Sequence, residues 1–189
     1  LVPKRGRIIA FDSGKSLETC LAKAFSPVER YGTAEGSTWR IANIKVGPER
    51  TQWSIFKDGQ IWADMEFSLA GEYNVRNATA AAALASAYGI SKDKIQSALK
   101  SFKSVKRRLE VRAQVAGVTV IDDFAHHPTA IRETIMALRG RYPGSRLWAI
   151  LEPRSNTMRR KVLQDDLADS LGLADEVIIA NVFKSEAIP

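Results

Sequence analysis

Three short apolar segments alternate with two helical patterns in the second half of the chain, at residues 118–121, 147–151 and 176–180. This β-α-β-α-β order predicts a doubly wound parallel sheet with right-handed connections. The first segment runs into residues 122–128 and the second into residues 152–157, and both stretches are rich in polar side chains. Ligands of open α/β sheets bind just beyond the carboxyl ends of the strands, so we expect the functional site there.

The first half of the chain predicts a mixed α/β arrangement. Strands are expected at residues 7–11 and 38–46. A β-hairpin over residues 52–69 is expected to turn at Asp58-Gly59, because both positions of such a turn need a positive φ. An alanine-rich helix is expected from about Asn74 to Tyr88, since alanine is the strongest helix former.

The balance of charge favours an anionic partner. Lysine and arginine number 28 against 21 acidic residues, which gives a formal net charge of +7. The densest basic cluster lacks interleaved aromatic residues and any recognisable nucleic-acid motif. We therefore expect a nucleotide or another phosphate-bearing small molecule, and no nucleic acid. The cluster consists of Lys103, Lys106, Arg107, Arg108 and Arg112.

Composition also bears on the compartment. The sequence contains no apolar run long enough to span a membrane and no secretory signal pattern. Cys20, the single cysteine, excludes an internal disulfide and fits a reducing compartment. Its helical spacing from Leu17 predicts a core position. We expect a cytoplasmic protein with no membrane partner.

Two asparagines begin the alanine-rich helix. Asn74 and Asn77 are three residues apart, so both lie on one face of the first turn. Neighbouring carboxamides can donate and accept together, which suits the edge of a purine base. Asn74 is equally well explained as a helix N-cap.

The segment after residue 121 carries acid and base chemistry. Asp123 is placed where a carboxylate can accept hydrogen bonds from a ribose hydroxyl. His126 and His127 precede a helix whose N-terminus favours anions, so a histidine there could bind phosphate. Metal ligation by Asp123 and the histidines is an alternative, but no third ligand has suitable spacing.

The segment after residue 151 offers hydrogen-bond donors. Arg154, Asn156 and Arg159 could bind a carboxylate or a phosphate. A polar helix cap would explain Ser155 or Asn156, but it would not explain both arginines.

Three motifs, taken in order, resemble those of the Mur ligase family. Gly71-x-Tyr73-Asn74-x-x-Asn77 is similar to the family signature Gly-x-His-Asn-x-x-Asn, and residues 106–110 resemble its interdomain junction. Residues 122–129 resemble the Asp-Asp-Tyr-Gly-His-His-Pro-Thr of the UDP-N-acetylmuramate ligases. The resemblance implies a mixed-sheet remnant of the central ATPase domain over residues 1–107. A Rossmann-like C-terminal domain with a doubly wound parallel sheet, expected to be truncated, would occupy residues 108–189.

The resemblance also implies an activity. Family members use ATP and Mg²⁺ to convert a carboxylate into an acyl phosphate, which an amine then attacks to form an amide. Residues 152–159 resemble the branch that joins UDP-N-acetylmuramate to the tripeptide L-alanyl-γ-D-glutamyl-meso-diaminopimelate during peptidoglycan recycling. The branch that adds L-alanine is one alternative, and a non-catalytic module that binds nucleotides or nucleic acid is another. The His126-His127-Pro128 tract argues against folylpolyglutamate and cyanophycin synthetases.

Matching positions suggest roles for individual residues. Asn74 and Asn77 match the family's adenine contacts, and Asp123 matches its ribose-binding aspartate. Arg108 and His126 match a junction arginine that reaches the nucleotide and a histidine on the phosphate side, which makes both candidate catalytic residues.

Other positions match the acceptor side of the family or depart from its pattern. Arg154, Asn156 and Arg159 would line the acceptor side. Tyr73 stands where the family usually has histidine, which leaves the role of that position open. The sequence contains no Gly-x-x-Gly-Lys-Thr-Thr loop, so we expect this piece alone to be inactive.

Overall fold

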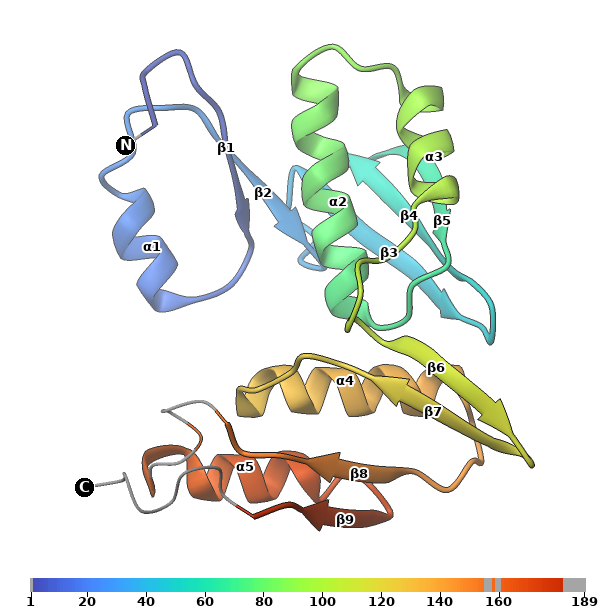
Figure 1. Ribbon diagram of the computed structural model, residues 1–189. Helices are drawn as coiled ribbons and strands as arrows, with labels where there is room; N and C mark the ends of the chain where they lie inside the picture. Colours follow the sequence, from blue (N-terminus) through green and yellow to red (C-terminus); the bar gives the residue numbers. More distant parts are fainter. Residues whose placement is uncertain (1, 155–157, 159–160, 182–189) are drawn as a thin grey trace. The chain divides into compact units, whose positions relative to one another are not determined.

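The computed structural model describes residues 2–154, 158 and 161–181 (Figure 1). The chain forms two compact units. The first ends at Lys103, and the second begins at Ser104. Each unit has its own hydrophobic core.

A five-stranded sheet forms the first unit, with its strands in the order β1-β2-β3-β4-β5. The first three strands run parallel, and β3, β4 and β5 run antiparallel. The expected mixed sheet is therefore confirmed. The strands are β1 Ile8–Phe11, β2 Val28–Gly32, β3 Trp39–Val46, β4 Thr51–Lys57 and β5 Gln60–Phe67.

The turn between β4 and β5 forms as the sequence predicts. Asp58 has a φ of 50° and Gly59 a φ of 81°. Both values lie in the left-handed region that two-residue hairpin turns require. The β2 strand was not expected, because Glu29 and Arg30 stand at its centre.

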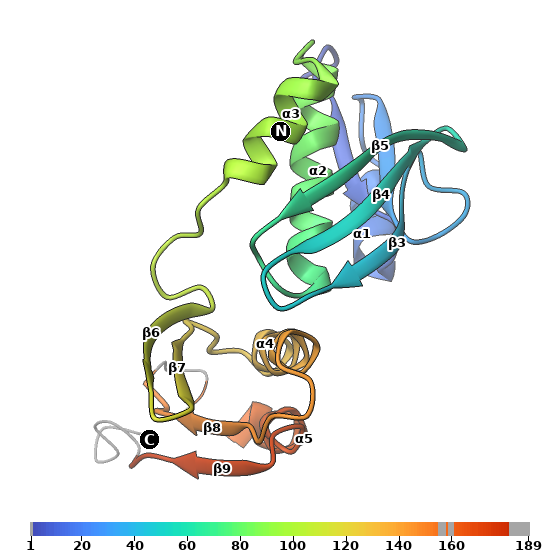
Figure 2. The same ribbon diagram turned by 90° about the vertical axis from the view of Figure 1, so that its right-hand side faces the viewer.

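Two helices pack against this sheet, and Figure 1 shows both in front of it. Helix α2, Glu72–Ala87, contacts strands β1 to β4, and α3, Lys92–Ser101, packs on β5. The alanines of α2 allow close approach to a core that includes Trp39, Trp53 and Ile55. Figure 2 shows α2 and α3 from the side.

Helix α1, Lys15–Leu21, corrects one expectation. Cys20 is exposed rather than part of the core. Leu17 and Leu21 are half-buried and four residues apart, so the apolar stripe of this short helix passes beside Cys20.

The second unit contains two strand pairs and two helices. The β6–β7 pair is antiparallel, and the β8–β9 pair is parallel and joined through α5. Ile131, Ile135 and Leu171 bury their side chains against the β8 strand. The elements are β6 Glu110–Val115, β7 Val118–Asp122, α4 Pro128–Arg141, β8 Trp148–Leu151, the 3-10 helix η1 Lys161–Leu163, α5 Gln164–Leu171 and β9 Glu176–Ile179.

The α/β class of the second unit is confirmed, but its strand pairing differs in one respect. The sequence predicts that β7, β8 and β9 share one parallel sheet. Among the described residues, β7 pairs with β6 and not with β8. Ala116 and Gly117 have φ values of 48° and 79°, so a tight hairpin turn places the unexpected strand β6 along one edge of β7.

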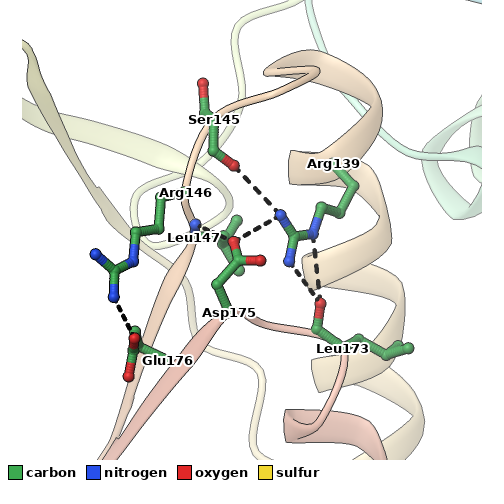
Figure 3. A network of polar contacts seen from close by, with 7 residues as sticks. All are labelled: Arg139, Ser145, Arg146, Leu147, Leu173, Asp175 and Glu176. Atoms are coloured by element: carbon green, nitrogen blue, oxygen red, sulfur yellow. Dashed lines mark hydrogen bonds and ion pairs between the residues drawn. The ribbon is translucent and has the colours of Figure 1, made fainter.

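A polar network joins α4 to the beginnings of β8 and β9 (Figure 3). The Arg139 guanidinium donates to the carboxylate of Asp175 at 2.8 Å and to the carbonyl of Leu173 at 3.0 Å. The same Asp175 oxygen accepts the Leu147 N–H at 2.6 Å. Three separate chain segments therefore meet around one side chain.

Candidate functional site

The two candidate purine-binding asparagines are placed differently by α2. This helix begins after Gly71, which has a φ of 91°, so Asn74 lies inside the first turn and is not its N-cap. The Asn74 Nδ2 atom donates to the carbonyl of Ala70 at 2.8 Å, and its side chain is half-buried. Asn77 is exposed. Asn77 is therefore the more accessible carboxamide for a ligand.

The junction, residues 106–110, leads into β6 in the second unit. Arg107 and Leu109 have φ values of 58° and 47°, both unusual for residues with side chains. The Arg107 N–H donates to Glu110 Oε2 at 2.8 Å, and its carbonyl accepts the Phe124 N–H at 2.9 Å. Arg108 lies between the two left-handed residues and is exposed.

Asp123 holds this junction against the beginning of the segment that leads to α4. Its Oδ2 atom accepts the Leu109 N–H at 2.8 Å. Its Oδ1 atom accepts the Ala125 N–H at 2.8 Å and the Thr134 hydroxyl at 3.2 Å. A carboxylate offers about four acceptor positions, so one remains for a ligand.

The two histidines make different contacts. The Nδ1 atom of His127 accepts the Thr129 N–H at 3.3 Å, so His127 is the N-cap of α4. The Nδ1 atom of His126 lies 2.9 Å from the carbonyl of Phe124 and must carry a hydrogen to bond it. His126 is exposed, and its Nε2 atom is the ring nitrogen left for a ligand.

These contacts bring the second-unit residues together. The Phe124 ring packs edge-on against His126, with the ring centres 4.9 Å apart. The Arg107 guanidinium lies 5.1 Å from the centre of the same ring. The junction, Asp123 and His126 therefore form one cluster at the N-terminal end of α4. Asn74 and Asn77 belong to the first unit.

The acceptor-side residues are described only in part. The Nε atom of Arg154 lies 3.5 Å from Glu152 Oε1, and both side chains are largely exposed. Asn156 and Arg159 lie outside the described residues.

Part of the basic cluster is neutralised within the second unit. Arg112 pairs with Glu110 at 3.0 Å, and Arg107 Nε lies 3.5 Å from Asp122 Oδ2. The hydrogen bond from the Arg107 N–H, reinforced by Arg112, holds the pKa of Glu110 below its usual value. Such internal pairing reduces the positive charge that a nucleic acid would meet.

Metal ligation by the aspartate and histidines finds no support in the geometry. Across the ranges that the structure describes, no three His, Cys, Asp or Glu side chains are grouped to hold a metal ion.

Several features of the site have no signal in the sequence. The backbone amides of Leu109 and Ala125 and the hydroxyl of Thr134 are internal partners of Asp123 that no motif indicates. The N-cap role of His127 could have been found, because Pro128 marks the first position of a helix.

A groove of about 750 Å³ lies elsewhere, in the first unit. Strands β3 to β5 and α3 line it, with Asn43, Asp64 and Lys100 among the residues concerned. As far as the structure describes the chain, the lining includes none of the predicted site residues.

Two protein-family models match the chain, one in each unit. The Mur ligase middle domain matches residues 2–85, and the Mur ligase glutamate ligase domain matches residues 107–188. The chain belongs to the Mur ligase family, whose members are ATP-dependent ligases of peptidoglycan synthesis.

Two curated relatives represent different branches. The chain is 42% identical over 181 residues to the UDP-N-acetylmuramate–L-alanyl-γ-D-glutamyl-meso-2,6-diaminoheptandioate ligase of Escherichia coli K12. That match covers 95% of this chain and 39% of the relative. The chain is 37% identical over 175 residues to a UDP-N-acetylmuramate–L-alanine ligase of Levilactobacillus brevis, with 93% and 39% covered.

A solved structure agrees with the fold. The murein peptide ligase of Psychrobacter arcticus superimposes with a TM-score of 0.61 at 38% identity, over 94% of this chain and 37% of that one. The chain spans about two fifths of the length of the two curated relatives. Within the described part of the chain, no helix is both long and apolar enough to cross a membrane.

Proposed function

We propose that this chain is part of an ATP-dependent ligase that joins UDP-N-acetylmuramate to L-alanyl-γ-D-glutamyl-meso-diaminopimelate in the cytoplasm. The observation that carries the proposal is the cluster of Arg108, Asp123 and His126 at the N-terminal end of α4. An exposed guanidinium, an exposed imidazole and a helix N-terminus all favour a bound phosphate. Residues 1–107 would be the end of the central domain, and residues 108–189 the C-terminal domain.

Each unit offers groups that suit part of a nucleotide. In the first unit, Asn77, with Asn74 beside it, would hold the adenine edge. In the second unit, the remaining acceptor position of Asp123 would take a ribose hydroxyl. Arg108 would donate to phosphate oxygens. His126 could donate from Nε2 only when its ring is doubly protonated, since Nδ1 already donates to Phe124.

The chemistry needs charge stabilisation. Bound ATP with Mg²⁺ supplies the phosphoryl group that activates the muramate carboxylate. Arg108 and His126 would stabilise the negative charge that develops on the phosphate oxygens during this step. The amine of the tripeptide then forms the amide, and phosphate leaves.

The tripeptide is the proposed acceptor for two reasons. Residues 152–159 have the pattern of the tripeptide-adding branch, and the Escherichia coli relative of that branch is 42% identical. The L-alanine-adding relative is 37% identical, so the two branches are close. Arg154, Asn156 and Arg159 are proposed to recognise the carboxylates of the longer acceptor.

Phosphate release by the full-length protein tests the proposal. ATP, Mg²⁺ and UDP-N-acetylmuramate are supplied with either the tripeptide or free L-alanine. We expect turnover with the tripeptide and little with L-alanine. Turnover with L-alanine alone would assign the protein to the other branch. No turnover, together with salt-sensitive binding of DNA or RNA, would favour a nucleic-acid-binding module.

Variants at the acceptor side sharpen this test. Arg159→Gln should raise the KM for the tripeptide and leave the KM for ATP unchanged. Lys161→Gln is the matched control, because it removes the same charge two residues away. An equal effect of both variants would contradict a specific role for Arg159.

A further inference from the structure

Asp123 joins segments that are distant in the sequence. One oxygen accepts the Leu109 N–H, and the other accepts the Ala125 N–H, both at 2.8 Å. The Thr134 hydroxyl on α4 donates to the second oxygen at 3.2 Å. Hydrogen bonds to an ionised acceptor are stronger than those between neutral groups, so this carboxylate is well suited to fix the backbone.

The backbone that Asp123 fixes adopts a conformation that needs support. Arg107 and Leu109 both have positive φ values, at 58° and 47°. Arginine and leucine rarely occupy this region unless surrounding contacts impose it. Those contacts are the Asp123 bond to the Leu109 N–H, and the Glu110 and Phe124 bonds to the backbone of Arg107.

Arg108 stands between these two strained residues. Its own side chain is exposed, while the backbone on both sides of it is held by hydrogen bonds. A fixed backbone on both sides sets the direction in which the Arg108 side chain leaves the junction. We propose that Asp123 is a positioning residue, which acts on the nucleotide through Arg108 in addition to any contact with the ribose. This inference rests on the proposed nucleotide-binding role of Arg108.

Nucleotide analogues separate positioning from ribose binding. The analogue 2′,3′-dideoxy-ATP lacks both ribose hydroxyls, so an aspartate that only binds the ribose has no effect on it. Asp123→Asn keeps the size of the side chain but points an amide towards one of the backbone N–H groups. A positioning residue therefore still matters for the dideoxy nucleotide.

The experiment measures nucleotide affinity in the full-length protein. We expect Asp123→Asn to weaken 2′,3′-dideoxy-ATP binding by about tenfold, as for one lost charge-assisted hydrogen bond. In an Arg108→Ala background, the same change should have little further effect. Unchanged dideoxy-ATP affinity in Asp123→Asn, or an equal loss in both backgrounds, would overturn the proposal.

Hydrogen exchange gives a readout that is independent of catalysis. Asp123→Asn should speed exchange of the Leu109 and Ala125 amides, whereas Asp122→Asn should leave them unchanged. Asp122 is the matched control because the Leu109 and Ala125 amides donate to Asp123, whereas the carboxylate of Asp122 lies 3.5 Å from the side chain of Arg107. If the wild-type protein bound no ATP, the proposed function would fail. Unchanged exchange in Asp123→Asn would overturn the positioning role itself.

Discussion

Arg139 and Asp175 form an ion pair 2.8 Å long that connects the last turn of α4 to the beginning of β9. The Asp175 carboxylate also accepts the Leu147 N–H, just before β8. The Arg139 guanidinium also donates to the Leu173 and Ser145 carbonyls. One pair of side chains thus links the helix to both strands of the parallel pair.

We expect this pair to make the second unit sensitive to acid. Arg139 and the Leu147 N–H lower the pKa of Asp175 from 3.8 to about 2. A carboxyl group with a depressed pKa stabilises the fold above its unfolded pKa and loses that contribution as the pH falls. We expect the free energy of unfolding to decrease as the pH falls from about 4 to about 2. Urea unfolding across this range measures it.

Asp175→Asn should remove this part of the pH dependence and lower stability at neutral pH. Asp169→Asn provides the control, because Asp169 is on α5 and exposed. The same decrease in both variants would mean that general charge, and not the Arg139 pair, is responsible.

A buried hydrogen bond joins sheet and helix in the first unit. The Trp53 indole N–H donates to the Thr79 hydroxyl at 3.1 Å, and both side chains are almost fully buried. Thr79→Val keeps the shape but leaves the indole N–H unpaired, so we expect a loss of about 1–3 kcal/mol in unfolding free energy. Thr79→Ser keeps the hydroxyl and should retain the bond. Near-ultraviolet circular dichroism would show whether the Trp53 environment survives.

Local sequence signals explain which elements could be predicted. The alanines of α2 and the Asp58-Gly59 turn act through their own backbone preferences, and both are confirmed. The β2 strand was missed because its central charges are satisfied by distant residues. The Trp39 indole donates to Glu29 at 2.6 Å, and Arg30 pairs with Glu18 at 2.6 Å.

In the candidate site, too, features set by local sequence could be predicted, and features set by distant contacts could not. The motifs identified Arg108, Asp123 and His126, and contacts of the neighbouring residues Arg107, Leu109 and Phe124 join their segments in the second unit. The left-handed backbone at Arg107 and Leu109 could not be predicted, because intrinsic preferences oppose it and tertiary hydrogen bonds impose it. The roles of these residues towards a nucleotide remain predictions.

The two asparagines of α2 should differ when substituted. Asn77→Ala should raise the KM for ATP and leave the melting temperature unchanged, because Asn77 is exposed. Asn74→Ala should also lower stability by about 1 kcal/mol, since it removes the hydrogen bond to the buried Ala70 carbonyl. Steady-state kinetics and thermal unfolding of both variants make the comparison. A stability loss in Asn77→Ala would show that this carboxamide has a structural role.

Arg108 offers the sharpest distinction between nucleotide and nucleic-acid binding. Arg108→Lys keeps the charge but loses the planar fork that binds phosphate oxygens in pairs. A nucleotide site should therefore lose about tenfold in ATP affinity, as for one charge-assisted hydrogen bond. Lys103→Gln, which changes an exposed residue of the same basic run in the sequence, should have no effect on ATP affinity.

A surface for nucleic acid would respond in the opposite way. It would tolerate Arg108→Lys, weaken with Lys103→Gln, and depend steeply on salt, because such binding follows the number of charges. Isothermal titration with ATP and with single-stranded DNA at two salt concentrations distinguishes the two cases.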